Sequence, residues 1–259
     1  MKRILIFFAL IVFSLGSFAQ VSYLQYRVVP DDKEAEFVEK ETKYWSKVAQ
    51  AAANQGHLAG WSLWRKVGVT KIDAPNYVFV NSFESLDKMD PSKVWSEANL
   101  KTMGMDPDKV ETASFTTVPF DYWMQLEDVI PGEYKYAIVN YAKPTDRQAF
   151  IEENKKLWKP LHEKTIKAGT NGMTSWGLMS VIYPAGNQDR FSVFTWDGFN
   201  TMADALGYLS YSSPDADGTG GNSDWTEVLS KTKMADILPN GFEYSIIYER
   251  VMSVGPQQD

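Results

Sequence analysis

The sequence contains no cysteine and only two histidines, His57 and His162, among its 259 residues. The lack of cysteine excludes disulfide bonds, thiolate metal sites and cysteine nucleophiles. A histidine-based zinc site would need both histidines, which fall in different parts of the chain. The GxGxxG, P-loop, GxSxG and HExxH patterns are also missing. We therefore expect no metal centre and no cofactor, and a Ser–His–Asp mechanism has no support.

Basic residues are outnumbered, with 26 Lys and Arg against 33 Asp and Glu and a formal net charge of −7. Nucleic-acid binding depends on basic patches, so the charge balance argues against nucleic acid as a partner. Aromatic residues are abundant instead, including 9 Trp and 13 Tyr. Such residues fill cores, and they also line pockets for small apolar or aromatic molecules.

Long apolar runs are missing except near the start of the sequence. Lys2 and Arg3 precede the apolar run 4–13, and small residues lead up to Ala19. This arrangement is typical of a secretory signal cleaved after Ala19, and the run is too short for a membrane span. The signal predicts a periplasmic or secreted protein with no membrane span. A lipid anchor would need a cysteine at the cleavage site.

The sequence contains an internal repeat. Residues 134–158 follow the same plan as residues 23–45: an aromatic-rich strand, a proline-containing turn, and a helix carrying Phe and Trp. Phe37 and Trp45 match Phe150 and Trp158 at one offset, 113 residues. A repeat of this kind fixes the architecture. It predicts a signal peptide at 1–19, one unit at 20–130, a second at 131–254, and a tail at 255–259.

Each unit is predicted to be βαββαβ, the ferredoxin-like arrangement. Strands are expected at 23–29, 60–67, 76–83 and 120–127, and again at 133–141, 173–181, 190–196 and 242–250. Helices are expected from Asp31 or Asp32 to about residue 54, within 91–113, and from Thr145 to about residue 168. Large apolar residues occur on both faces of the strands, whereas a solvated face would alternate more clearly. The predicted fold is therefore α+β, with two tandem ferredoxin-like repeats whose sheets pack face to face as an α/β barrel within one chain.

This plan resembles the dimeric α/β-barrel superfamily, in a form that carries both units in one polypeptide. That superfamily includes antibiotic-biosynthesis-monooxygenase-like, EthD-like and NIPSNAP-like proteins, stress-response barrels and haem-binding relatives. The resemblance implies a fold that hosts oxygenases, isomerases and proteins without known activity. Three functions stay open: binding of a small apolar or aromatic molecule, cofactor-independent oxygenase or isomerase chemistry, and a structural or interaction role with a packed lumen.

The alternation of the first strand predicts which side chains face the opposite sheet. Leu24, Tyr26 and Val28 are expected against the helices, and the residues between them toward the other sheet. The repeat offset extends this prediction to Tyr136, Ile138 and Asn140. The resulting candidates for ligand binding are Tyr23, Gln25, Arg27, Tyr136, Asn140 and Asn154.

Glu41 is a candidate catalytic residue because it falls near the middle of an apolar helix face. At about 100° per residue, Phe37 and Val48 lie on the same side. Asn154 occupies the equivalent position in the second unit. A buried carboxylate is either paired, with Arg27 as the candidate partner, or it has a raised pKa and acts as a general acid or base. Both readings stay open.

His162 is the second catalytic candidate. It follows Trp158 by four residues, with Pro160 between them, and lies at the border of the apolar stripe. One reading is a haem ligand or proton-transfer group, which the resemblance to haem-binding relatives suggests. The other is a histidine with ordinary packing.

The loop 213–224 reads SPDADGTGGNSD and offers oxygen ligands suited to calcium. Its spacing departs from the EF-hand pattern, because Glu227 falls one position late. The alternative is a solvated insertion loop.

Overall fold

The computed structural model describes residues 21–68, 74–210 and 223–257. Eight strands run through these segments: β1 (Val21–Val28), β2 (Gly60–Lys66), β3 (Tyr77–Phe83), β4 (Thr117–Ile130), β5 (Tyr136–Ala142), β6 (Met173–Tyr183), β7 (Val193–Phe199) and β8 (Tyr244–Val254). All eight strands expected from the sequence are present.

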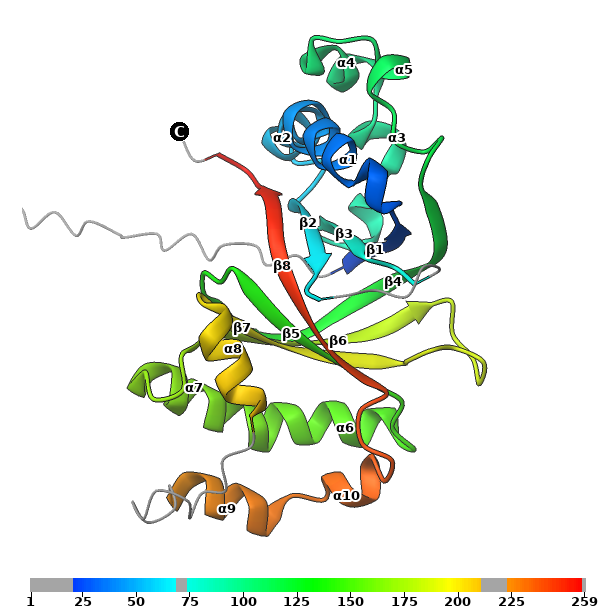
Figure 1. The fold of residues 1–259 in the computed structure, drawn as a ribbon. Helices are drawn as coiled ribbons and strands as arrows, with labels where there is room; N and C mark the ends of the chain where they lie inside the picture. The colour runs from blue at the N-terminus through cyan, green and yellow to red at the C-terminus, as the bar shows by residue number, and fades with distance from the viewer. Residues whose placement is uncertain (1–20, 69–73, 211–222, 258–259) are drawn as a thin grey trace, which may run out of the picture.

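The helices lie outside the strands, in two groups on opposite sides of the molecule (Figure 1). The first group is α1 (Glu34–Lys40), α2 (Ser46–Asn54), α3 (Pro91–Val94), α4 (Glu97–Leu100) and α5 (Pro107–Val110). The second group is α6 (Arg147–Glu153), α7 (Lys159–Ala168), α8 (Met202–Leu209), α9 (Ser223–Lys231) and α10 (Met234–Ile237).

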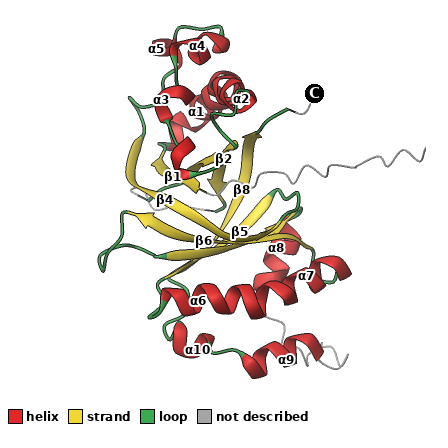
Figure 2. Ribbon diagram, turned by 180° about the vertical axis from the view of Figure 1, so that it is seen from behind, coloured by secondary structure: helices red, strands yellow, loops and turns green. Residues whose placement is uncertain are grey.

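The strands form a closed barrel in the order β1-β3-β2-β8-β5-β7-β6-β4. Read by halves, this order is β4-β1-β3-β2 followed by β8-β5-β7-β6, so the two halves share one topology. Figure 2 shows the two sheets facing each other between the helical layers. The prediction of an α+β fold with two ferredoxin-like units in an intrachain α/β barrel is confirmed.

Strands β4 and β8 join the two halves. β4 pairs with β1 through Gln125↔Val21 and with β6 as far as Ile130↔Trp176. β8 pairs with β5 and then with β2, as far as Val254↔Trp61. Both strands are longer than the sequence predicted. At their ends, residues 128–130 of β4 and 252–254 of β8 pair across the halves, whereas Thr117 at the start of β4 pairs with Val28 of its own half.

Three large apolar cores fill the layers, and a smaller fourth one gathers Val48, Met103 and Val110 among the helices of the first half. One lies between the first sheet and its helices around Phe37 and Tyr77, and one lies beneath the second sheet's helices around Phe150 and Trp176. The third lies inside the barrel around Tyr122 and Met124. Within the three described segments, none of the helices has the length and apolar content to cross a bilayer.

The main helix of each half contains one π-helical turn. Glu41–Trp45 separates α1 from α2, and Asn154–Trp158 separates α6 from α7. Such turns insert an extra residue per turn and occur frequently at functional sites. The start of α6 corrects one prediction: Asp146, not Thr145, caps it, accepting a hydrogen bond from the Ala149 N–H at 2.9 Å.

Candidate functional site

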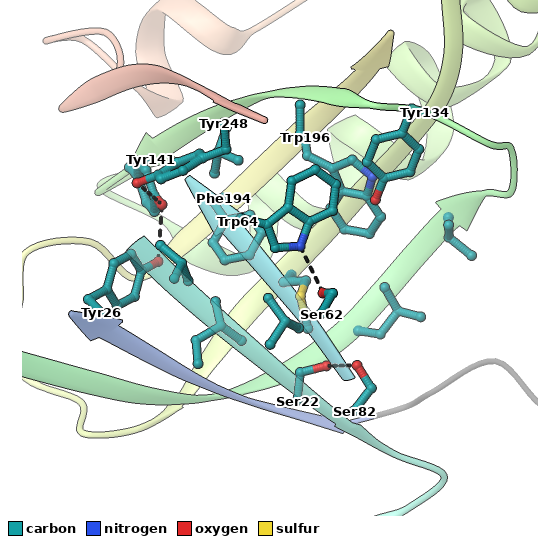
Figure 3. Close-up of a pocket in the computed structure, with 18 residues that line it drawn as sticks. Ser22, Tyr26, Ser62, Trp64, Ser82, Tyr134, Tyr141, Phe194, Trp196 and Tyr248 are labelled. Carbon is teal, nitrogen blue, oxygen red and sulfur yellow. Dashed lines mark hydrogen bonds between the residues drawn. The ribbon is translucent and has the colours of Figure 1, made fainter. Parts of the chain in front are cut away.

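The barrel encloses a cavity of about 300 Å³ (Figure 3). Among the described residues, those that line it are aromatic, aliphatic or hydroxyl-bearing, and none of them carries a formal charge. Aromatic side chains from both halves form much of the wall, including Tyr26, Trp64, Tyr141, Phe194 and Trp196. The lumen is therefore an apolar compartment with a few polar groups.

Most of the polar groups in the lumen are satisfied by one another. The Tyr26 hydroxyl donates to that of Tyr141, which donates to that of Tyr248, each at 3.1 Å. Burial raises the pKa of all three phenols, so each stays protonated. The Trp64 Nε1–H donates to the Ser62 hydroxyl at 2.8 Å.

The predicted orientation of the first strand is wrong. Leu24 and Tyr26 line the lumen, whereas Tyr23 packs in the core beneath the helices. Gln25 and Arg27 share the face of Tyr23, as strand periodicity requires. Both faces of β1 contact apolar cores, so alternation alone did not identify the inner face.

The same correction applies to the second half. Ile138 packs against Phe150 beneath the helices, and Tyr136 borders that core. Asn140 follows the same parity, whereas Ala137 and Val139 line the lumen. The predicted ligand-binding side chains of both strands therefore face the helical layers instead of the barrel cavity.

Glu41 is buried beneath the first helical layer, as the helix periodicity predicted, with 5% of its surface exposed. The Thr112 hydroxyl donates to its Oε1 at 2.7 Å, and Arg27 Nη1 donates to that hydroxyl at 3.4 Å. Burial raises the pKa of Glu41 to about 7, and the hydrogen bond from Thr112 and the charge of Arg27 oppose this rise. Thr112 thus links Glu41 to Arg27, and no direct ion pair between the two is found in the described part of the chain.

The other candidates on this face take part in local hydrogen bonds. The Tyr23 hydroxyl donates to Asp121 at 2.5 Å, and Gln25 donates to the Tyr23 hydroxyl at 3.1 Å. The Arg27 guanidinium also lies 4.8 Å from the centre of the Phe79 ring. The structure therefore brings Tyr23, Gln25, Arg27 and Glu41 onto one side of the first sheet.

Asp197 is a buried carboxyl that sequence analysis missed. It has 3% of its surface exposed and accepts a hydrogen bond from Asn140 Nδ2 at 2.8 Å, while Ser245 donates to Asn140 Oδ1 at 2.7 Å. Burial raises the pKa of Asp197 to about 7, opposed by the hydrogen bond from Asn140. A single acidic residue within the apolar strand 193–199 was the signal that could have revealed it.

His162 and Asn154 lie in the second half, on the opposite side of the barrel from Glu41. The imidazole of His162 stacks on Trp176 with the ring centres 5.6 Å apart, and its Nδ1 has no hydrogen-bond partner in the part of the chain that the structure describes. Burial lowers the pKa of His162 to about 4, so the ring is neutral at physiological pH. Asn154 donates to the Phe150 carbonyl at 2.9 Å within its own helix.

Metal binding finds no support in the described segments, where no three acidic, His or Cys side chains gather as a metal site. Residues 213–222 of the loop considered for calcium lie outside those segments. Calcium binding by the loop and haem binding by His162 therefore stay hypotheses beside the expectation of no metal and no cofactor. A melting temperature unchanged by calcium or chelator, and haemin that shows no Soret shift, would contradict them.

Two glycines shape one end of the cavity. A Cβ atom at Gly177 would lie 1.9 Å from the Trp196 ring, and one at Gly198 would lie 2.7 Å from the Tyr134 ring. The outer face of this end opens into a hollow of about 470 Å³ that shares Val129, Tyr134 and Trp196 with the cavity. We take these shared residues as the mouth of the cavity.

Comparison with solved structures agrees with the observed fold. A monooxygenase-like protein from Lactobacillus acidophilus has 9% identity and a TM-score of 0.53, covering 92% of this chain and 96% of its own. An anthrone oxidase-like protein has 11% identity and a TM-score of 0.54, covering 94% and 96%. A monooxygenase-like protein from Fusobacterium nucleatum has 10% identity and a TM-score of 0.54, covering 92% and 95%.

At such low identity these likenesses establish the dimeric α/β-barrel fold alone. No family model matches the sequence, and no curated protein matches it.

Proposed function

We propose that this protein binds a small apolar or aromatic molecule inside its barrel. The observation that carries the proposal is the uncharged lumen cavity of about 300 Å³. An apolar cavity of roughly half that size is enough to hold benzene. The cavity also argues against the alternative of a structural protein with a packed lumen.

The side chains around the cavity favour binding over catalysis. A general acid or base near neutral pH is usually a His, Asp, Glu or Lys, and none of these lines the cavity. The titratable groups there are tyrosines, and burial raises the pKa of Tyr26, Tyr141 and Tyr248. These phenols can orient a ligand by hydrogen bonding while staying neutral.

The alternative function is a cofactor-independent oxygenase or isomerase of the dimeric α/β-barrel type. Its support is Glu41, whose pKa of about 7 suits proton transfer at neutral pH. Tyr23, Gln25 and Arg27 lie on the same side of the first sheet and would contact the substrate. Under this alternative, Glu41→Gln would abolish turnover without lowering stability, and His162 would belong to a separate site.

Binding is tested by titration calorimetry with 2-ethylnaphthalene, a neutral aromatic hydrocarbon. We expect one site per chain with a Kd on the order of 10 μM. Val80→Phe, which places a ring in the cavity, should abolish the heat of binding. Val118→Phe is the control, because Val118 is 42% exposed and does not line the cavity. Equal binding by both variants would place the ligand elsewhere, and no binding by the wild type would contradict the proposal.

We also propose that the protein works in the periplasm or outside the cell, supported by the signal-like segment 1–19. Intact mass spectrometry of protein from its own host should show a chain that begins at Gln20. A chain retaining Met1, or one found only in the cytoplasm, would contradict this proposal.

A further inference from the structure

The mouth end of the cavity brings together two hydrogen-bond donors. Within the described segments the buried Trp196 Nε1–H has no hydrogen bond of ordinary geometry, and a weak hydrogen bond from it lowers the pKa of Tyr134, against the larger effect of burial. The Tyr134 hydroxyl lies beside it (Figure 3). Both side chains line the cavity. The other indole in the wall differs, because the Trp64 N–H is already paired with Ser62 at 2.8 Å.

Between them the two groups carry more donor protons than they can use on each other. An indole N–H can only donate, and a phenol has one proton and one acceptor oxygen. If Trp196 donates to the Tyr134 oxygen, the phenol proton is left for another acceptor. If it does not, both protons are left. In either arrangement at least one donor proton needs a hydrogen-bond acceptor that neither residue supplies, because an unpaired buried donor is unfavourable.

The surrounding packing holds both donors in place. The Trp196 ring lies directly over Gly177, with no room for a Cβ atom. The Tyr134 ring stacks on Trp64 with centres 5.5 Å apart and planes 21° apart, and it also contacts Gly198. Burial raises the pKa of Tyr134 to about 12, so its hydroxyl stays protonated. Fixed donors select an acceptor more strongly than mobile ones, because less ordering is needed on binding.

We propose that Trp196 and Tyr134 receive a neutral carbonyl oxygen of an otherwise apolar aromatic ligand, so that the ligand class is an aromatic ketone rather than a hydrocarbon or an acid. This inference rests on the proposed function. The carbonyl lies at the mouth, and the apolar body lies against residues such as Val80, Val139 and Met179. A carboxylate is disfavoured because none of the residues lining the cavity carries a positive charge.

The test compares 2-acetylnaphthalene with 2-ethylnaphthalene, which has nearly the same shape but no carbonyl oxygen. Calorimetry on the wild-type protein should show the ketone binding about fivefold more tightly, the effect of one hydrogen bond. If the hydrocarbon binds as tightly as the ketone, Trp196 and Tyr134 do not recognise the carbonyl oxygen, although the proposed function stands. If neither compound binds, the proposed function fails and this inference fails with it.

Variants assign the preference to the two donors. Tyr134→Phe removes a single oxygen atom and should lower the preference for the ketone, and adding Trp196→Phe should abolish it while the hydrocarbon still binds. Tyr183→Phe is the matched control, because Tyr183 is 65% exposed and does not line the cavity, and it should keep the fivefold preference. A double variant that keeps the preference would overturn the inference. So would a control that loses it. Should the double variant not fold, Tyr134→Phe alone decides, since a full preference in that variant contradicts the assignment.

A third compound, 2-naphthoate, tests the neutrality of the ligand. It should bind more weakly than 2-ethylnaphthalene, because its carboxylate would lose water without gaining a cation inside the cavity. The Arg250 guanidinium lies outside the cavity lining, 5.8 Å from the centre of the Tyr134 ring. If 2-naphthoate binds most tightly of the three, Arg250 recruits an anion and the assignment to a neutral ketone is wrong.

Discussion

Gly177→Ala is expected to destabilise the protein by about 3 kcal/mol, at the upper end of the range for overpacked cores. Gly177 lies on β6 directly opposite Trp196 of β7, and an added Cβ would lie 1.9 Å from the indole. The indole cannot turn away easily, because its other neighbours include Phe194 at 6.4 Å between ring centres. Urea denaturation should show a lower midpoint, and the melting temperature should fall by about 10 °C.

A matched control separates this clash from the general effect of replacing glycine. Gly207 lies in α8, and nothing lies within 4 Å of the position its Cβ would take. Gly207→Ala should therefore stabilise the protein by about 0.5–1 kcal/mol through the higher helix propensity of alanine. If Gly177→Ala instead matches the wild type in stability, the indole is not held over that glycine. The position of the Trp196 ring in the cavity wall would then be wrong.

The second large effect concerns Glu41 and pH. The pKa of Glu41 rises from 4.5 to about 7 on folding, so the folded state binds its proton more tightly than the unfolded state. The stabilisation from this group is therefore complete below about pH 4.5 and is lost as the pH rises through 7. At about 1.4 kcal/mol per pH unit, the loss between pH 4.5 and 7 amounts to roughly 3–3.5 kcal/mol.

Glu41→Gln should remove that loss. We expect the variant to match the wild type near pH 4.5 and to be more stable by about 3 kcal/mol at pH 8, because no charge has to be buried. The amide at Asn154 shows that an uncharged polar side chain is accommodated at the equivalent helix position. The measurement is urea denaturation at several pH values. A variant with the same pH slope as the wild type would show that Glu41 is not the group responsible.

Two other buried groups shape the same pH profile and must be included in its interpretation. Asp197, with its pKa raised to about 7, loses stabilisation over the same range as Glu41. His162, with its pKa lowered to about 4, has the opposite sign: its stabilisation is present above pH 6.5 and is lost as the pH falls through 4. Glu163→Gln is the control, since Glu163 is exposed on α7, and it should leave the profile nearly unchanged.

The fold could be predicted from the sequence because the chain contains the same structural unit twice. The offset that relates Phe37 to Phe150 predicts two copies of one unit, and strand and turn chemistry predict the elements within each copy. The lengths of β4 and β8 could not be predicted in this way. Residues 128–130 of β4 and 252–254 of β8 pair with the other half, and a repeat within one half contains no information about that pairing.

The candidate site was predictable only in part. Helix periodicity correctly placed Glu41 and Asn154 in the interior, because each main helix has a single apolar face. The strands gave no such guide: Leu24 and Tyr23 are both apolar, and each packs in a core on its own side of β1. Trp196 and Tyr134 were not identified either, since their role depends on the glycines beneath them and on strands from both halves.

The way β8 joins the halves also bears on how the chain folds during its synthesis. The pairing of Trp61 with Val254 brings together two strands that lie near opposite ends of the described chain. The strands of the first half can pair with one another while the second half is still on the ribosome, but β2 keeps an open edge until β8 emerges. Contacts so distant in sequence form slowly, and an open strand edge can pair with another chain. A chaperone would therefore be needed most while only the first half has been synthesised, because the edge of β2 is then open.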